Sequence, residues 1–293
     1  MTTMPRLSAL ATLHLIVFIW GFTGILGELI SLDAAPLVWW RTLIATISIA
    51  AYTLWVKKSL RVGLLPFLQF GITGLVTAAH WIFFFAAIKS SNVSTALVVL
   101  STNSFFVALV APLISKSKFR PYELLLGVLV IAGLSLIFHF EPQYKMGIIL
   151  SLASAFCAAI FSSANSVFVK KYEPTTIAFY ELLTAFVGVS VYLAFSQNGL
   201  SSITMLQKSD VLWLLLLGTL ATAFAFIKAI DVMKVLSPFT CAITINLEPI
   251  YTIVFALLLF GEKEYMSPQF YLGSVLLIGT LFLESFLQQK WNK

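Results

Sequence analysis

Charged residues are scarce in this 293-residue chain, where Lys, Arg, Asp and Glu together make up 10% of the sequence. Soluble domains carry about 25%, and here 60% of the residues are hydrophobic. The longest polar connection extends only from about Ser196 to Asp210. It leaves no room for a soluble catalytic or nucleotide-binding domain, so we expect a protein that works within the bilayer.

Several motifs are also missing. Cys157 and Cys241 both lie in apolar runs, which is typical of packed side chains rather than of disulfides or metal ligands. No Gly-x4-Gly-Lys-Ser/Thr stretch indicates an ATP-driven pump, and no His-Glu-x-x-His motif indicates a metalloenzyme. Basic residues in short loops account for the net charge of +6, which suits lipid headgroups better than nucleic acid. We expect no cofactor, no metal and no nucleic-acid partner.

Long hydrophobic runs are what the chain has in abundance. A helix needs about 20 apolar residues to cross the hydrocarbon core, and ten runs of that length occur. The pattern therefore predicts an all-α polytopic membrane protein with ten transmembrane helices. No Ala-x-Ala pattern follows the first run, so we interpret it as an uncleaved helix. The ten predicted spans are Leu7–Ile30, Pro36–Val56, Val62–Ile88, Val93–Ser115, Tyr122–Phe140, Met146–Val169, Thr175–Phe195, Val211–Asp231, Pro238–Phe260 and Gln269–Leu287.

The basic residues predict how these spans are oriented. If the N-terminus is cytoplasmic, twelve Lys and Arg residues lie in cytoplasmic segments and four on the opposite side. Positively charged loops are retained in the cytoplasm, so we expect both termini to be inside. Most tryptophans fall near span ends, as in an interfacial belt, while Trp20 lies deeper. The six tryptophans assigned to that belt are Trp39, Trp40, Trp55, Trp81, Trp213 and Trp291.

An internal repeat divides the chain. A shift of 140 places residues 37–43 over 177–183, and a shift of about 145 places residues 87–89 over 232–234. Five spans precede about Glu141 and five follow. Because five is odd, the second set must enter the membrane from the opposite side. We therefore predict two inverted five-helix repeats, residues 1–142 and 143–293, with a substrate site near the midplane between them.

Two motifs resemble a known family. Residues 234–263 resemble the penultimate helix of the EamA family of the drug/metabolite transporter superfamily, especially Leu247-Glu248-Pro249 and Phe260-Gly261-Glu262. Pro36-Leu37-Val38-Trp39-Trp40-Arg41 is similar to the start of that family's second helix. The first half departs from the pattern, with Thr102-Asn103-Ser104 where Leu-x-Pro is expected and Ser115-Lys116 in place of Gly-Glu. The resemblance implies a ten-helix permease, often an exporter of amino acids or related metabolites, in a bacterial inner membrane.

Glu248 is the first candidate for the substrate site. It lies about ten residues into the ninth span, close to the midplane, where an ionised carboxylate is expensive. Pro249 cannot donate its backbone nitrogen and favours a kink beside the acid. Asn246 adds polar capacity, and the repeat places Asn103 at the matching depth. Glu248 is either a structural, protonated acid or a substrate or proton site.

Four further residues complete the candidate site. Arg41 is a planar donor able to hold a carboxylate. It aligns with Glu181 in the repeat, and we expect each to hold a partner at its own end of the cavity. Trp20 is the deep tryptophan, and His80 is either a protonation gate or an interfacial hydrogen-bonding group. Lys228 is either functional or snorkels to the cytoplasmic boundary beside Asp231.

The mixed signs of these charges favour a small zwitterionic or mostly uncharged organic substrate. We predict a secondary transporter, not an enzyme, that works by alternating access and uses a proton or another coupling ion. The alternatives are an intramembrane enzyme and a non-transporting membrane scaffold. A transporter moves a solute, an enzyme alters one, and a scaffold does neither. The oligomeric state stays open.

Overall fold

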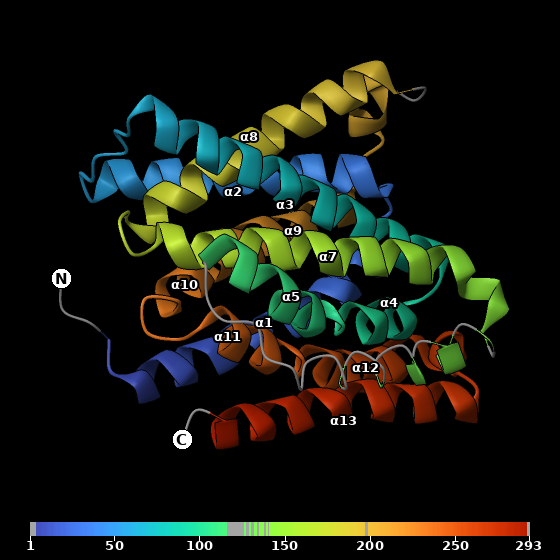
Figure 1. The fold of residues 1–293 in the computed structure, drawn as a ribbon. Coiled ribbons are helices and arrows are strands. Elements are labelled where there is room, and N and C mark those ends of the chain that lie inside the picture. The colour runs from blue at the N-terminus through green and yellow to red at the C-terminus, as the bar shows by residue number, and fades with distance from the viewer. Residues whose placement is uncertain are drawn as a thin grey trace.

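The structure is a computed structural model that describes residues 4–115, 141–196 and 199–291, with isolated positions between 126 and 139. Nearly all of these residues are helical, as the sequence predicts, and the long helices lie side by side (Figure 1). The helices are α1 (Arg6–Leu29), α2 (Ala34–Trp55), α3 (Leu64–Ser90), α4 (Val93–Leu100), α5 (Asn103–Ser115), α7 (Lys145–Phe168), α8 (Pro174–Phe195), α9 (Lys208–Gly218), α10 (Ala225–Val232), α11 (Pro238–Ile245), α12 (Glu248–Phe260) and α13 (Pro268–Trp291). Short 3-10 turns at η1 (Pro142–Tyr144), η2 (Leu200–Thr204) and η4 (Gly261–Glu264) connect them, and η3 (Thr219–Phe224) is a π-helix.

Eight segments of the described chain are long and apolar enough to cross a membrane. Two of them, 93–114 and 238–260, each join two short helices, and a third, 208–232, contains the π-helix. The predicted fifth span, 122–140, lies almost wholly outside the described residues. The predicted tenth span corresponds to α13, a helix of 24 residues that is not one of the eight. The chain is a multi-pass membrane protein, and the count of ten spans stays a prediction.

The two halves repeat one another in helix length. Helices α1 and α7 each have 24 residues, and α2 and α8 each have 22. The short helices α4 and α11 have 8 residues each, and α5 and α12 have 13 each. Even the N-caps correspond, because Asn92 accepts from the Thr95 amide and Ser237 accepts from the Thr240 amide. Both halves therefore build the same broken helix.

The break arises from different residues in the two halves. In the second half Pro249 lies in the first turn of α12, where its missing N–H is tolerated. In the first half, Ser101 and Thr102 donate their hydroxyls to the carbonyls of Val98 and Val99 at 2.6 and 2.8 Å. Such side-chain bonds compete with the helical ladder. The first half therefore keeps a broken helix although it lacks the Leu-x-Pro pattern.

The halves also exchange their first helices. Helix α1 packs against α10, α11 and α12 of the second half, whereas α7 packs against α3, α4 and α5 of the first. Helices α2 and α8 pack against each other, as Figure 1 shows at the top of the view. Side chains of both halves consequently line the centre of the molecule.

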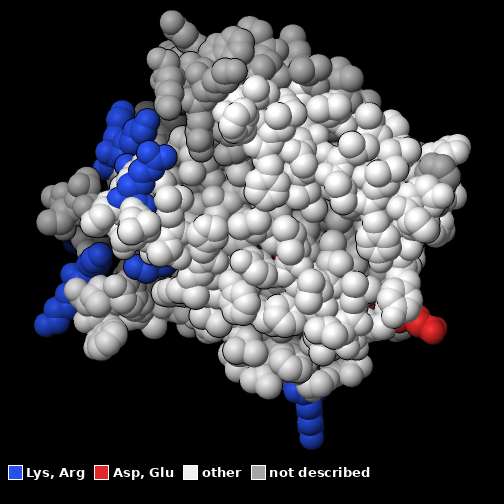
Figure 2. Space-filling model, turned by 90° about the horizontal axis from the view of Figure 1, so that it is seen from below, with Lys and Arg blue, Asp and Glu red and all other residues white. Residues whose placement is uncertain are grey.

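The outer face of the bundle suits a lipid environment. Large apolar side chains such as Leu54, Leu113 and Phe195 are exposed on it, and lipid tails satisfy such a surface. Basic side chains gather at one edge of the space-filling view (Figure 2), the end at which Figure 1 places both chain termini. One further basic side chain lies at the lower edge of the same view.

Candidate functional site

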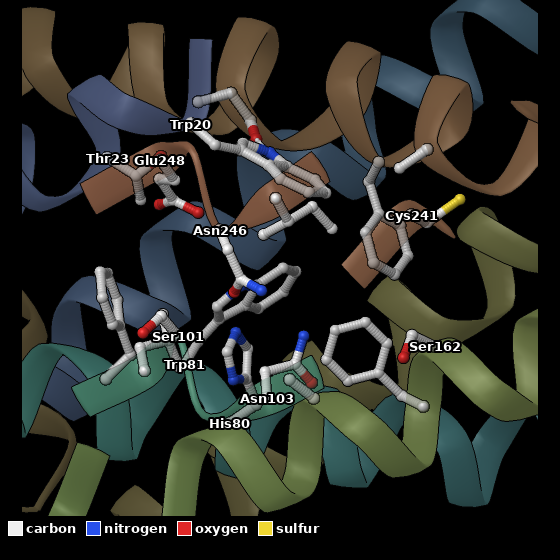
Figure 3. A pocket seen from close by; sticks show the side chains of 18 of the residues that line it. Trp20, Thr23, His80, Trp81, Ser101, Asn103, Ser162, Cys241, Asn246 and Glu248 are labelled. Atoms are coloured by element: carbon white, nitrogen blue, oxygen red, sulfur yellow. Dashed lines mark hydrogen bonds between the residues drawn. The ribbon is translucent and has the colours of Figure 1, made fainter. Parts of the chain in front are cut away.

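A cavity lies between the two halves, with about 1020 Å³ of empty space including its mouth. Helices α1 to α5, α7 and α10 to α12 contribute side chains to its wall (Figure 3). Its polar or charged lining residues are Thr23, Arg41, His80, Ser101, Asn103, Ser162, Asn165, Asn246 and Glu248, with Trp20 and Trp81 among the aromatic ones.

Six of the seven residues singled out from the sequence line this cavity. They are Trp20, Arg41, His80, Asn103, Asn246 and Glu248. Lys228 instead lines a second pocket, together with Lys58 and Glu173. Asp231 forms its ion pair with Lys234, at 3.0 Å. Asp231 lines the same pocket as Lys228. Lys228 therefore does not join the other candidates, and its snorkelling beside Asp231 stays a prediction.

The broken helices carry three of these residues into the cavity. Asn103 is the first residue of α5 and Glu248 the first residue of α12, and Asn246 lies in the second break (Figure 3). Glu248 is only 6% exposed. A helix N-terminus carries partial positive charge, which favours an acidic side chain in its first turn. The break therefore provides a place where a carboxylate is tolerated deep in the bundle.

Close packing of α1 on α12 keeps Glu248 in place. The Thr252 hydroxyl, one turn after Glu248, lies 2.7 Å from the Gly21 carbonyl of α1 and 2.9 Å from the Glu248 carbonyl. A Cβ on Gly21 would lie 3.1 Å from the Tyr251 Cβ. Glycine at this position therefore avoids a tight contact and lets the two helices approach closely.

Arg41 is buried, with 2% of its surface exposed, and is fixed on two sides. Its Nε donates to the Thr222 hydroxyl at 2.7 Å. The guanidinium carbon lies 4.1 Å from the centroid of the Trp81 ring and 5.6 Å from that of Phe85, within cation–π range. Its Nη1 has no hydrogen-bond partner among the described residues. The guanidinium therefore keeps a donor available for a ligand.

A single irregular turn positions both Arg41 and Trp20. The π-helix η3 carries Thr222, whose hydroxyl contacts the Leu217 carbonyl at 2.6 Å, and Ala221, whose carbonyl accepts from the Trp20 indole at 3.0 Å. Such π-turns occur often at functional sites. Widening the helix by one residue turns these two groups toward α1 and α2.

His80 is anchored rather than free. Its Nδ1 lies 2.9 Å from the Ser154 carbonyl, and the Ser154 hydroxyl donates to the His80 carbonyl at 3.0 Å. The same Nδ1 also lies 2.8 Å from the Ser154 hydroxyl, so Ser154 holds the ring through both its backbone and its side chain. The ring packs against Phe161, with centroids 5.3 Å apart. A gating role for His80 stays a prediction.

Several lining residues escape the sequence analysis. Trp81, assigned there to the interfacial belt, is 6% exposed and lies beneath Arg41, so that interpretation is wrong. Position along a span indicates depth but not which way a side chain points. Thr23, Ser162 and Asn165 also line the cavity. The sequence signal that could have identified these three is that each is a polar residue on an otherwise apolar helix.

The chemistry of the cavity is that of a balanced binding site. It presents one guanidinium and one carboxyl, with amides, hydroxyls and aromatic rings between them. Arg41 and Glu248 form no direct ion pair in the described structure, so a ligand has room to contact both. Among the described residues no cluster of His, Cys, Asp or Glu fits a metal ion.

Comparison with known proteins places the chain in a family. The model of the EamA-like transporter family matches residues 7–139 and again 145–286. A protein of Archaeoglobus fulgidus named as an uncharacterized transporter is 23% identical over 96% of this chain and 98% of its own length. An uncharacterized transporter of Haemophilus influenzae is 24% identical over 88% of both chains.

Two further similarities are partial or structural. The uncharacterized inner membrane transporter YhbE of Escherichia coli is 28% identical over 52% of this chain and 44% of its own length. A protein of known crystal structure superposes with a TM-score of 0.70 at 18% identity, over 97% of this chain and 99% of the other. That likeness shows a shared fold. With two family matches over most of its length, this chain belongs to the EamA-like transporter family of membrane proteins.

Proposed function

We propose that this protein is a secondary transporter of small zwitterionic organic metabolites, amino acids among them, that works by alternating access. The observation that supports this most strongly is the shared cavity. It holds Arg41 and Glu248, one group of each charge, without a direct ion pair between them. A carboxylate suits the unpartnered Nη1 of Arg41, and an ammonium group suits Glu248.

The two breaks support the transport mechanism. Discontinuous helices that meet at a cavity between two repeats are a common design of secondary transporters. Rocking of one half against the other about this cavity exposes the ligand to each side in turn. Equal helix lengths in the halves and the exchanged first helices agree with inverted repeats. Export is the direction we propose, as the family resemblance implies.

Balanced charge also predicts what the cavity rejects. A polyanion such as a nucleotide sugar is repelled by Glu248 as well as attracted by Arg41. Its net electrostatic attraction to the cavity is therefore small and does not offset the free energy of desolvating its charges. An intramembrane enzyme or a scaffold remains the competing class. We favour transport because the chain belongs to the EamA-like transporter family.

Transport into liposomes tests the proposal. Purified protein is reconstituted with internal unlabelled amino acids, and uptake of labelled amino acids by exchange is measured. We expect exchange of at least one zwitterionic amino acid, recovered chemically unchanged. Arg41→Gln should abolish it, whereas Lys228→Gln, which removes a cation outside this cavity, should not. Exchange of a nucleotide sugar without any response to amino acids contradicts the proposed substrate, and chemical conversion of the solute supports an enzyme.

Reporter fusions test the proposed orientation with both termini inside. A reporter active only in the cytoplasm should work after Lys58, in the loop that follows α2. It should also work when fused after Lys118. A strong external signal at either position contradicts the inverted repeat.

A further inference from the structure

A second buried acid, Glu181, lies outside the residues that line the cavity. It is the eighth residue of α8 and has no exposed surface. Its Oε2 accepts a hydrogen bond from Nδ2 of Asn165, on α7, at 3.1 Å. Glu181 Oε1 and Asn165 Oδ1 have no partner among the described residues. Two buried acceptor oxygens of one pair are thus left without a donor.

No cation faces this carboxyl among the described residues. Helix α8 packs against α2, α3 and α10. On α2, Arg41 is bonded to Thr222, and on α3, His80 is bonded to Ser154. On α10, Lys228 lines the other pocket.

The remaining charged groups of these helices are also engaged elsewhere. Lys89, near the end of α3, donates to the Ile30 carbonyl at 2.7 Å, and Asp231 of α10 pairs with Lys234. An ionised carboxylate buried without a partner costs several kcal/mol. Glu181 therefore sits where a negative charge is strongly disfavoured.

We propose that Glu181 and Asn165 form a proton-binding site that couples substrate movement to a proton gradient. A proton from water binds Glu181 and forms an O–H bond, giving a neutral acid. Its O–H donates to Asn165 Oδ1 while Asn165 Nδ2 donates to Oε2, so one proton supplies a partner to both unsatisfied oxygens. Breaking the O–H bond returns the proton to water and restores the carboxylate.

Asn165 connects this site to the transport path, because it lines the cavity whereas Glu181 lies behind it. The inference rests on the proposed function, but the site is separate from the substrate groups. Its equivalent in the first half is Arg41, the eighth residue of α2. The repeat therefore places a substrate ligand in one half and a proton carrier in the other.

Gradient-driven accumulation tests this coupling. Reconstituted protein is compared under exchange conditions without a gradient and under a pH difference of one unit, with the membrane potential clamped at zero. One proton per substrate supports up to about tenfold accumulation for such a gradient. Glu181→Gln keeps the shape but cannot titrate. We expect it to retain exchange and to lose accumulation, reaching only the level measured without a gradient.

A matched control is Ser163→Ala on α7, which removes another buried, unpartnered hydroxyl and should leave accumulation unchanged. Accumulation by Glu181→Gln equal to that of the wild type overturns the proposal. So does accumulation driven by a sodium gradient at equal pH and not by protons.

Infrared difference spectroscopy gives a readout that does not need transport. The band of a protonated carboxyl should disappear in Glu181→Gln and persist in Ser163→Ala. An unchanged band in Glu181→Gln overturns the proposal, even if no substrate is transported. If the wild type shows this band but exchanges no substrate, that result counts against the proposed function alone. If Glu181→Gln does not fold, Asn165→Ala should shift the same band, and an unshifted band contradicts the pairing.

Discussion

The two buried glutamates of this bundle occupy contrasting surroundings. Glu248 begins a helix and faces a cavity that also holds Arg41. Glu181 lies within a helix, is bonded only to an amide, and lines neither pocket described. An acid beside open space and a cation can stay charged and contact a ligand. An acid enclosed with neutral groups is best satisfied by a proton. Burial alone therefore does not indicate what a membrane carboxyl does.

The largest effect should come from removing the cation that makes the Glu248 region different. Arg41→Gln leaves Glu248 without a complementary charge and removes the proposed carboxylate donor. Loss of one partner of a buried charged contact costs about 2–5 kcal/mol, so substrate affinity should fall by about 30-fold or more. Isothermal titration of purified protein measures this loss. An unchanged affinity removes Arg41 from the substrate site.

Glu248→Gln should have the next largest effect, and it distinguishes the proposed role of Glu248 from that of Glu181. A hydrogen bond to a charged group contributes about 1.5–3 kcal/mol, so affinity should fall by about 10- to 100-fold. Residual transport should still respond to a pH gradient, unlike that of Glu181→Gln. If Glu248→Gln binds normally but loses its response to the gradient, the roles of the two acids are reversed.

Gly74→Ala tests the packing behind Glu181. A Cβ at this position of α3 would collide with the Glu181 backbone and the Thr184 hydroxyl of α8. Overpacking of this kind costs about 1–3 kcal/mol, and the thermal stability of the purified protein should fall. Gly71→Ala is the matched control, since its Cβ would meet only Thr184 Cγ2 at 3.5 Å. Equal stability of the two variants contradicts the close contact of α3 and α8.

Thr222→Val should have the smallest effect, because it leaves the charge of Arg41 in place. The variant removes the hydroxyl that accepts from Arg41 Nε, and we expect affinity to fall several-fold through loss of positioning. Thr219→Val, an exposed threonine in the same π-helix, serves as the control. The positioning role is wrong if both variants bind the substrate equally well.

The helical, multi-pass character of the fold was predictable because the thickness of the bilayer sets the length of the apolar spans. Most candidate residues were also found, since polar groups such as Glu248 and Asn103 stand out on apolar helices. The π-helix was not, because nothing in Thr219–Phe224 differs from an ordinary apolar turn. The direction of a side chain around its helix was also hidden, as Trp81 shows. The separate pocket that Lys228 lines could not be predicted for the same reason.

The internal repeat was informative but incomplete. It aligned Arg41 with Glu181 and predicted that each holds a partner at its own end of the cavity. That prediction is wrong for Glu181, which is not among the residues that line the cavity. What the repeat could not supply was the neighbour of each group, because Thr222 comes from a helix of the other half and Asn165 from the helix that precedes α8. Such contacts depend on how separate helices pack against one another. Sequence spacing within one helix carries no information about that packing.

The central claim is that Arg41 binds the carboxylate of a zwitterionic substrate, and a binding cycle tests it most directly. Wild type and Arg41→Gln are each titrated with the amino acid that exchanges best and with its amide, which lacks the carboxylate. The account predicts that the amide binds the wild type about 100-fold more weakly but binds Arg41→Gln almost as well as the amino acid does. Equal losses of affinity in both proteins would contradict it.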